Sequence, residues 1–152
     1  MRAIAAALVL VAACAQAAQP PGKRAPVERI GEPSINGQRL PFADAVRVGD
    51  MLFLSGQIGN RADGSLPPGI EAQARQTMDN IGRVLKGQGL GFGDVVKCTV
   101  MLDNMADWPA FNRVYVTYFP DGKFPSRSAF GADGLALGAL VEVECWAYAG
   151  RK

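Results

Sequence analysis

Arg127 is the residue whose setting points most clearly to small-molecule chemistry. It lies in the segment Phe124-Pro125-Ser126-Arg127-Ser128, between a predicted turn and a predicted strand. A guanidinium group is always charged, and its fork of N–H donors matches the two oxygens of a carboxylate. Arg127 is therefore a candidate clamp for a small carboxylate. The alternatives are a solvated surface arginine and one that pairs with a structural acid.

Two carboxylates on one predicted strand are the second chemical feature. Glu142 and Glu144 alternate with apolar residues, so their side chains point to the same face of the strand. A glutamate that lines a cleft can position a water molecule and move its proton. The alternative is that this face is solvated surface.

Two further segments carry polar groups that could contact a ligand. Ser55-Gly56-Gln57 follows the apolar run Met51–Leu54, and a glycine there would let the backbone approach a ligand. A β-bulge or a sharp bend explains the same glycine equally well. Asn112 and Tyr115 lie on a predicted helix, where core packing is the simpler role for the tyrosine.

The composition excludes several classes of chemistry. The 152 residues include no histidine and three cysteines, which removes the usual Ser-His-Asp and Cys-His centres. It also removes histidine-ligated and four-cysteine metal sites, so we expect no metal. The net charge is +2, and the basic residues are scattered along the sequence. We therefore expect no nucleic-acid partner, because such proteins need a basic patch.

Residues 1–17 have the layout of a secretory signal peptide. Arg2 supplies an early positive charge, an apolar run follows over 3–13, and Ala15-Gln16-Ala17 fits a cleavage site. A buried N-terminal helix is the alternative. The segment Val11-Ala12-Ala13-Cys14 also resembles a bacterial lipobox, in which case the signal ends before Cys14 and that cysteine carries a lipid anchor. We expect an exported protein, either free in the periplasm or lipid-anchored in the cell envelope.

Residues 18–27 read as a flexible linker and 28–150 as one domain. The linker region is rich in proline and has no apolar periodicity. Within the domain, Cys98 and Cys145 lie in apolar, strand-like runs. This setting favours two unpaired, buried cysteines, and an oxidising compartment permits a disulfide as the alternative.

The apolar pattern of the domain predicts two helices between several strands. Residues 70–88 repeat apolar side chains at helical spacing, and Gly89 follows as a helix end. A second helix is expected over 108–119, with Asp107 as its N-cap. The expected strands are 45–48 and 51–57, which form a hairpin through Gly49-Asp50, and then 95–102, 124–130 and 140–149. This order indicates an α+β fold with the helices on one face of a mixed sheet. The other face would then need cover, for which a partner subunit is a sensible source.

Taken together, these segments resemble the RidA/YjgF family of imine deaminases. The resemblance covers nearly all of residues 40–148, in order and at family-like spacing. The matching segments include Gly49-Asp50-Met51-Leu52-Phe53-Leu54-Ser55-Gly56-Gln57-Ile58, Phe111-Asn112-Arg113-Val114-Tyr115, Pro125-Ser126-Arg127-Ser128 and Leu140-Val141-Glu142-Val143-Glu144. The breadth of the match carries the assignment more than any single motif does.

The resemblance implies a chorismate-mutase-like fold, a homotrimer and ligand sites in clefts between subunits. It implies hydrolysis of 2-imino acids, such as 2-iminobutanoate and 2-iminopropanoate, to 2-oxo acids and ammonia without a cofactor. The family's arginine matches Arg127 and its water-positioning glutamate matches Glu142. Ser55, Gly56 and Asn112 match positions near the site.

The sequence departs from the close imine deaminases at the expected site. Phe42 stands where many of them have tyrosine, and Ala129 stands where many have cysteine. Ala136 replaces a proline that is common in the last loop. Carboxylate binding is thus better supported than the usual substrate. Two alternatives to the deaminase stay open: a non-catalytic trimer in the cell envelope that binds small carboxylates, and a structural or holdase-like trimer.

Overall fold

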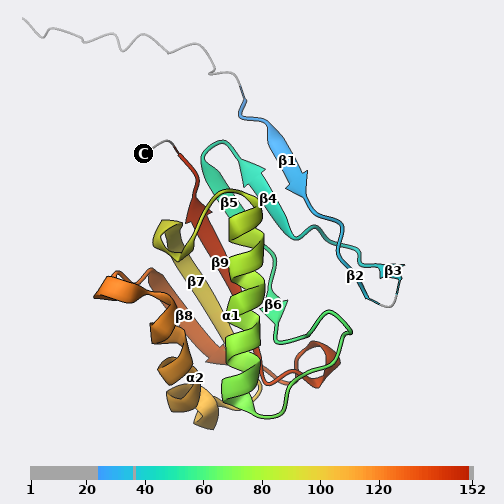
Figure 1. Cartoon of the computed structure of the whole chain (residues 1–152), viewed down its shortest axis with the longest axis vertical. Coiled ribbons are helices and arrows are strands. Elements are labelled where there is room, and N and C mark those ends of the chain that lie inside the picture. Colours follow the sequence, from blue (N-terminus) through green and yellow to red (C-terminus); the bar gives the residue numbers. More distant parts are fainter. Residues whose placement is uncertain (1–23, 36, 151–152) are drawn as a thin grey trace, which may run out of the picture.

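The computed structural model describes residues 24–35 and 37–150 as a mixed β-sheet with helices packed on one side (Figure 1). The predicted signal 1–17, with Cys14, lies outside the described residues, as does most of the linker 18–27. The helices are α1 (Ile70–Gly87) and α2 (Trp108–Tyr115). The strands are β1 (Val27–Ile30), β2 (Ser34–Ile35), β3 (Gln38–Arg39), β4 (Ala45–Val48), β5 (Met51–Leu54), β6 (Gln57–Ile58), β7 (Val95–Leu102), β8 (Ser126–Gly131) and β9 (Val141–Tyr148). None of the described helices is long and apolar enough to cross a membrane.

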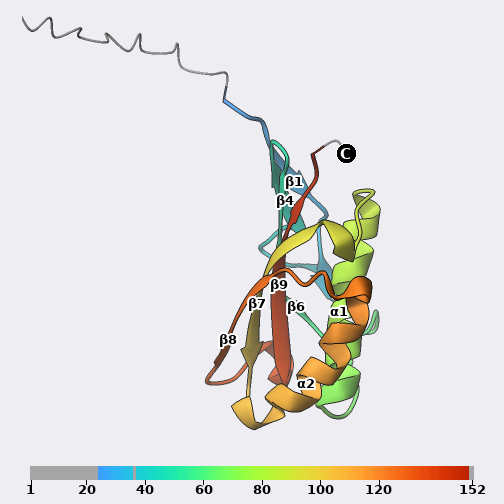
Figure 2. The ribbon, with the colours of Figure 1, turned by 90° about the vertical axis from the view of Figure 1, so that its left-hand side faces the viewer.

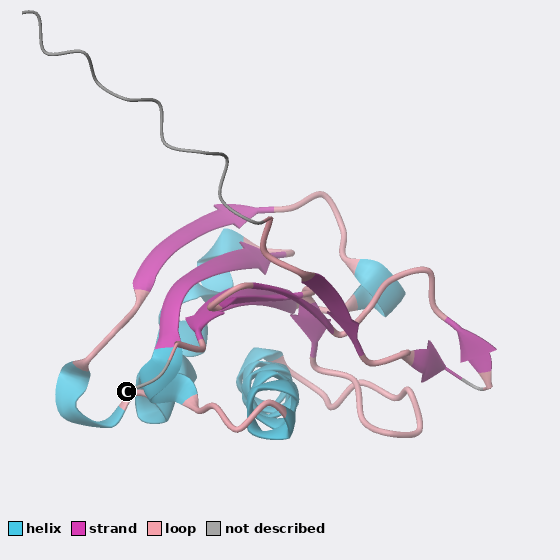
Figure 3. Ribbon diagram, turned by 90° about the horizontal axis from the view of Figure 1, so that it is seen from above, coloured by secondary structure: helices cyan, strands magenta, loops and turns pink. Residues whose placement is uncertain are grey.

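The main sheet runs in the order β1-β4-β5-β9-β7-β8, and β6 also pairs with β9. All of its pairings are antiparallel except the parallel pair β7–β8. Both helices lie on the same side of this sheet, which curves over them (Figures 2 and 3). The α+β architecture expected from the sequence is therefore confirmed. The opposite face of the sheet is left open in the single chain.

Helix α1 supplies much of the core, because its apolar residues fall on one stripe. Ala74, Met78, Ile81 and Leu85 are each 0 % exposed, and full burial of a large apolar side chain contributes about 1.5–3 kcal/mol. The helix ends as predicted. Gly89 adopts a positive φ of 71°, and the N–H groups of Gly89 and Leu90 donate back to the carbonyls of Lys86 and Leu85, in the hydrogen-bond pattern of a Schellman motif.

The start of the second helix differs from the prediction. Asp107 occupies the N-cap position of α2, as predicted, but its side chain makes no capping hydrogen bond. Instead, a 3-10 turn over Met105–Asp107 precedes α2, and the Asn104 side chain accepts a 3.0 Å bond from the Ala106 N–H. Neither this extra turn nor the capping role of Asn104 was predicted from the sequence. At its other end, α2 stops at Tyr115 and continues as a 3-10 turn over Val116–Tyr118.

A β-bulge separates β5 from β6 at Ser55-Gly56. Phe53 pairs with Trp146, whereas Gln57 pairs with Val143. Three residues of one strand thus face two of β9, which is the signature of a bulge. The bend that the sequence allowed at this glycine is therefore present. The predicted strand 51–57 is broken there into β5 and β6.

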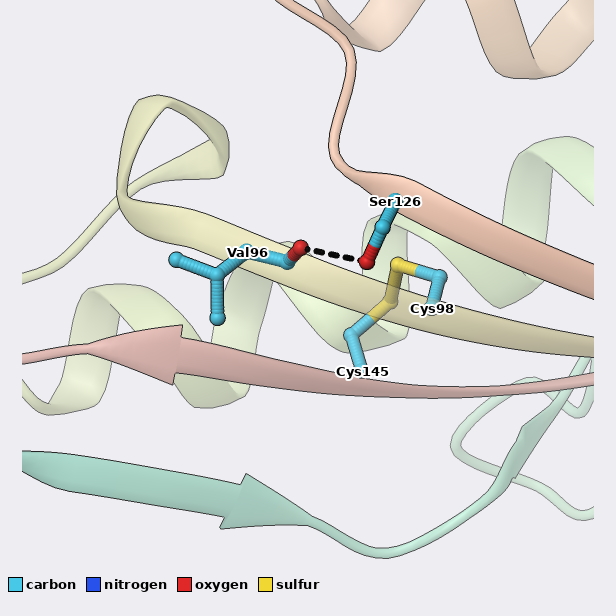
Figure 4. The surroundings of a disulfide bond; sticks show 4 residues. All are labelled: Val96, Cys98, Ser126 and Cys145. Carbon is cyan, nitrogen blue, oxygen red and sulfur yellow. Dashed lines mark hydrogen bonds between the residues drawn. A yellow bond between two sulfur atoms is a disulfide. The ribbon is translucent and has the colours of Figure 1, made fainter.

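Cys98 and Cys145 form a disulfide between the two central strands (Figure 4). They lie directly opposite each other in the antiparallel pair β7–β9, and both are 0 % exposed. The sequence favoured two unpaired cysteines, and that interpretation was wrong. Burial was predicted correctly, but the pairing depends on the β7–β9 register, which the local pattern does not encode. Cys98 also pairs with Arg127 of β8 on its other side, so the disulfide lies in the row of residues that contains the candidate clamp.

We expect loss of the disulfide to lower the free energy of unfolding by about 2–4 kcal/mol, because the bond closes a long loop in the unfolded chain. Its cysteines are separated by 47 residues. The measurement is urea denaturation of the Cys98→Ala/Cys145→Ala variant at one fixed protein concentration. Wild-type protein refolded under a dithiol reductant is the control that separates the bond from side-chain volume. Unchanged midpoints in both samples would contradict a stabilising role.

Candidate functional site

A cavity of about 590 Å³ opens beside the bulge. Four of the predicted site residues line it: Phe42, Ser55, Gly56 and Glu142. Gln57 and Ala136, which were also noted in the sequence, line it as well. Its walls come from the segment that includes β2 and β3, from the bulge and the loop after β6, and from the start of β9. Arg127, Asn112 and Ala129 are not part of its lining. The structure thus gathers only part of the predicted site in this cavity.

The bulge brings Glu142 against the backbone of Gly56. A Cβ atom built on Gly56 would overlap the Glu142 carboxylate, so only glycine leaves room for this side chain. Ser55 fixes the same corner, because its hydroxyl donates a 2.7 Å bond to the carbonyl of Ala43 and its N–H donates to that of Asp44. The local chain is therefore arranged around the carboxylate of Glu142.

The electrostatic setting of Glu142 suits a proton carrier. Partial burial raises the pKa of its carboxyl group, and the nearby charge of Glu144 raises it further. A raised pKa makes the carboxylate a stronger base than a solvated glutamate. The two glutamates share the open face of the sheet, since Val141, Val143 and Cys145 between and beside them are buried. Their predicted alternation along the strand is confirmed.

We expect Gly56→Ala to reduce kcat/KM by roughly 10- to 100-fold for a reaction in which Glu142 carries a proton. Small displacements of catalytic groups have effects of this size. The added methyl group must move the Glu142 carboxylate, while the fold should persist. Gly93→Ala is the matched control, because a Cβ there meets nothing within 4 Å. A Gly56→Ala enzyme with wild-type kcat/KM would show that the position of Glu142 does not matter.

Arg127 lies in a second location, between β8 and α2. Its guanidinium carbon is 4.5 Å from the ring centroids of both Trp108 and Tyr115. Such cation–π contacts orient an arginine without using up its N–H donors. No carboxylate in the described part of the chain lies within ion-pair distance of Arg127, whereas Arg39 and Arg113 each have a glutamate partner. Its fork of donors is therefore available to an anionic ligand.

Two buried polar side-chain atoms of α2 lack hydrogen-bond partners in the part of the chain that the structure describes. The side-chain oxygens of Asn112 and Tyr115 are buried, and neither makes a hydrogen bond within the described structure. Burial raises the pKa of Tyr115 to about 12, and the charge of Arg127 opposes that rise. Positions 108, 112 and 115 form one stripe of α2, so Asn112 lies on the helix between the two rings that contact Arg127. An unpaired buried polar atom costs about 1–3 kcal/mol, which a ligand or a partner could recover.

The two groups of residues lie on opposite faces of one sheet. Arg127 pairs with Cys98, which faces the helices, and Glu142 pairs with Met101, whose side chain points the other way. Two strand spacings and three residues along the sheet separate them, roughly 14 Å between Cα atoms. Ala129 lies two residues beyond Arg127 on the helix side. Within one chain, a small substrate cannot touch both Arg127 and Glu142.

Sequence reasoning missed Trp108 and gave Tyr115 only a packing role. Both rings hold Arg127, and their helical spacing of seven residues was visible in the sequence. What was missing was the knowledge that α2 crosses β8 at Arg127, which depends on the parallel β7–β8 pairing.

The comparisons with known proteins agree with this fold. The model of the family described as Endoribonuclease L-PSP matches residues 36–149. The chain is 39% identical over 112 residues to the 2-iminobutanoate/2-iminopropanoate deaminase of Mus musculus, which covers 72% of this chain and 82% of that protein.

Solved structures with the same fold include the YjgF gene product of Escherichia coli, with 31% identity, a TM-score of 0.72, and coverage of 80% of this chain and 98% of that one. Another is Escherichia coli TdcF with bound serine, with 27% identity, a TM-score of 0.71, and coverage of 84% and 99%. Family model, relatives and fold agree: the chain belongs to the Endoribonuclease L-PSP family, which is the RidA/YjgF family.

Proposed function

We propose that this protein hydrolyses 2-imino acids of the 2-iminobutanoate and 2-iminopropanoate type to 2-oxo acids and ammonia. The observation that carries the proposal is that the chain has both an arginine able to bind a carboxylate and a glutamate able to carry a proton. One location offers an arginine with free donors, and the other offers a glutamate of raised pKa in a cavity. Relatives at 35–41% identity are named imine deaminases, and one related structure holds a bound amino acid.

In the proposed mechanism, Arg127 holds the substrate carboxylate through two parallel hydrogen bonds. Asn112 and backbone groups at Ser55-Gly56 orient the imine. Glu142 takes a proton from a water molecule while the oxygen of that water bonds to the imine carbon. The proton then passes from Glu142 to the imine nitrogen. The hydroxyl group of the resulting carbinolamine then gives its proton to the amino group through Glu142. The C–N bond breaks, ammonia leaves, and the carbon–oxygen double bond of the 2-oxo acid forms.

This mechanism requires at least two chains, because Arg127 and Glu142 of one chain lie on opposite faces of the sheet. We propose a homotrimer in which Arg127 of one subunit meets Glu142 of the next. The open side of the sheet supports association, since it carries exposed apolar side chains: Val96, Phe130, Trp146 and Tyr148. The unpaired oxygens of Asn112 and Tyr115 also fit a surface that another subunit or a ligand completes.

We also propose that the protein works outside the cytoplasm, as the predicted signal of residues 1–17 suggests. The Cys98–Cys145 disulfide supports this, because disulfides form and persist mainly in oxidising compartments. Labelling with a membrane-impermeant reagent in intact and in permeabilised cells tests it. Protein that reacts only after permeabilisation of the inner membrane would refute export.

The test of the activity uses protein without residues 1–17. An amino-acid oxidase generates 2-iminobutanoate in place, and semicarbazide traps the imine that remains. We expect the protein to slow formation of the semicarbazone. A folded protein that binds 2-oxobutanoate but leaves the rate of trapping unchanged would be a binding module, and the deaminase proposal would fall.

A further inference from the structure

Two arginines line the same cavity as Glu142 and have no role in the mechanism above. Arg61 lies in the loop after β6, and Arg83 lies on α1. Arg61 lies 22 residues before Arg83, in the loop that leads into α1, and both side chains line the one cavity. Neither belongs to the segments that carried the family resemblance. They are the positively charged residues of a cavity whose acidic residues are Asp44 and Glu142.

A buried asparagine holds Arg83 and the loop segment that precedes Arg61. Asn80 is 2% exposed, and its amide group donates to the carbonyls of Ile58 and Asn60 at 2.9 and 3.0 Å. Its side-chain oxygen accepts a 3.0 Å bond from a terminal nitrogen of Arg83. The same side chain thus ties the loop that leads to Arg61 onto α1 and directs Arg83 toward that loop.

Arg61 is fixed by the tight turn that follows it. Its N–H donates to the carbonyl of Ser65 at 2.9 Å, and its guanidinium donates to the Ser65 hydroxyl at 3.2 Å. Asp63 accepts from both the N–H and the hydroxyl of Ser65. These bonds close the loop locally, so the position of Arg61 does not depend on a ligand.

Neither arginine has a carboxylate within ion-pair distance in the described part of the chain, unlike Arg39 and Arg113. Each spends one guanidinium donor on a neutral partner, an amide for Arg83 and a hydroxyl for Arg61. A guanidinium has five N–H donors, so most of them remain free. Two such groups in the lining of one cavity match the requirements of an anion.

We infer that Arg61 and Arg83 form a second anion site, which selects substrates with an acidic side chain. The inference rests on the proposed function. The substrate class is the 2-imino dicarboxylates, the imines of acidic amino acids, and the products are 2-oxo dicarboxylates. Arg127 of the neighbouring subunit takes the carboxylate next to the imine, Glu142 serves the imine carbon, and the two arginines take the distal carboxylate.

The experiment compares 2-iminoglutarate with 2-iminobutanoate, each made in place by an amino-acid oxidase and followed by semicarbazide trapping. The readout is the ratio of kcat/KM for the two substrates. We expect Arg61→Ala/Arg83→Ala to lower that ratio at least ~10-fold, the scale of a lost interaction between charged groups. Lys86→Ala is the matched control, because it removes a positive charge from the same helix outside the cavity and should leave the ratio as it is. An equal ratio in all three proteins overturns the inference.

A second readout needs no turnover and so separates this inference from the proposed function. Calorimetry compares the binding of 2-oxoglutarate and of 2-oxobutanoate to the protein that lacks residues 1–17. We expect wild-type protein to bind the dicarboxylate roughly tenfold more tightly, and the double variant to lose this preference. Preference without deamination would sink the proposed function and keep the anion site. Deamination without preference would do the reverse.

Discussion

Arg127→Ala is expected to reduce kcat/KM for imine hydrolysis by roughly 100- to 10,000-fold. A hydrogen bond to a charged group is worth about 1.5–3 kcal/mol, Arg127 makes two in the proposed complex, and each 1.36 kcal/mol is a factor of ten in rate. No described residue offers a second guanidinium between Trp108 and Tyr115 to compensate. The measurement is the semicarbazide assay over a range of imine concentrations.

Arg113→Ala is the control for that prediction. Arg113 lies on α2 next to Asn112, and it forms an exposed ion pair with Glu71, which contributes little to stability. Its loss should leave the assay unchanged. Arg127→Lys distinguishes charge from shape, since an ammonium group keeps the charge and loses the fork. If Arg127→Ala retains wild-type kcat/KM in a folded protein, Arg127 does not hold the substrate.

Glu142→Gln is expected to lower kcat by roughly 100- to 10,000-fold, the usual range for loss of a general base. The amide keeps the size of the side chain and cannot accept the proton of water. Glu144→Gln is a matched control two residues along the same face, and it should retain most of the activity. Equal losses in the two variants would show that Glu142 has no special role.

The pH profile tests the same residue independently. In the proposed mechanism Glu142 acts in its deprotonated form, so we expect the rate to fall as the pH drops through its pKa. Because burial and then the charge of Glu144 raise that pKa, the fall should begin at a higher pH than for a solvated glutamate. Glu144→Gln removes the second cause only, so it should move the fall part of the way toward lower pH. A profile unaffected by Glu144→Gln would contradict the coupling of the two carboxylates.

The elements with strong local patterns could be predicted from the sequence. The apolar stripe of α1, its glycine stop and the alternation of β9 each depend on neighbours within a few residues, and the structure has all three. The strand β7 has the predicted bounds, Val95–Leu102. These features are determined by short-range sequence patterns, and the tertiary structure retains them.

Other features depend on partners that are distant in the sequence. The strands β2 and β3 have two residues each, and most of their residues are polar or exposed, so they carry no periodic signal. β1 begins at Val27, where the composition suggested linker, because pairing with β4 decides its structure. The Cys98–Cys145 disulfide and the contact of Arg127 with α2 follow from strand pairing, which no local pattern reveals.

The candidate site shows the same division. Residue types and the family resemblance identified Arg127 and Glu142, but alternation along two separate strands could not place them relative to each other. Their opposite faces follow from the register of β8 and β9 on β7. The proposal of a site shared between two chains therefore needed the structure.

The most direct test of the account mixes two inactive variants. Arg127→Ala and Glu142→Gln proteins are unfolded together in equal amounts, refolded, and assayed for hydrolysis of 2-iminobutanoate. In a cyclic oligomer with sites between neighbours, random mixing gives each site one intact Arg127 and one intact Glu142 in about a quarter of cases. The account predicts recovery of about a quarter of wild-type activity. No recovery, with oligomers of wild-type size re-formed, would contradict a site shared between two chains.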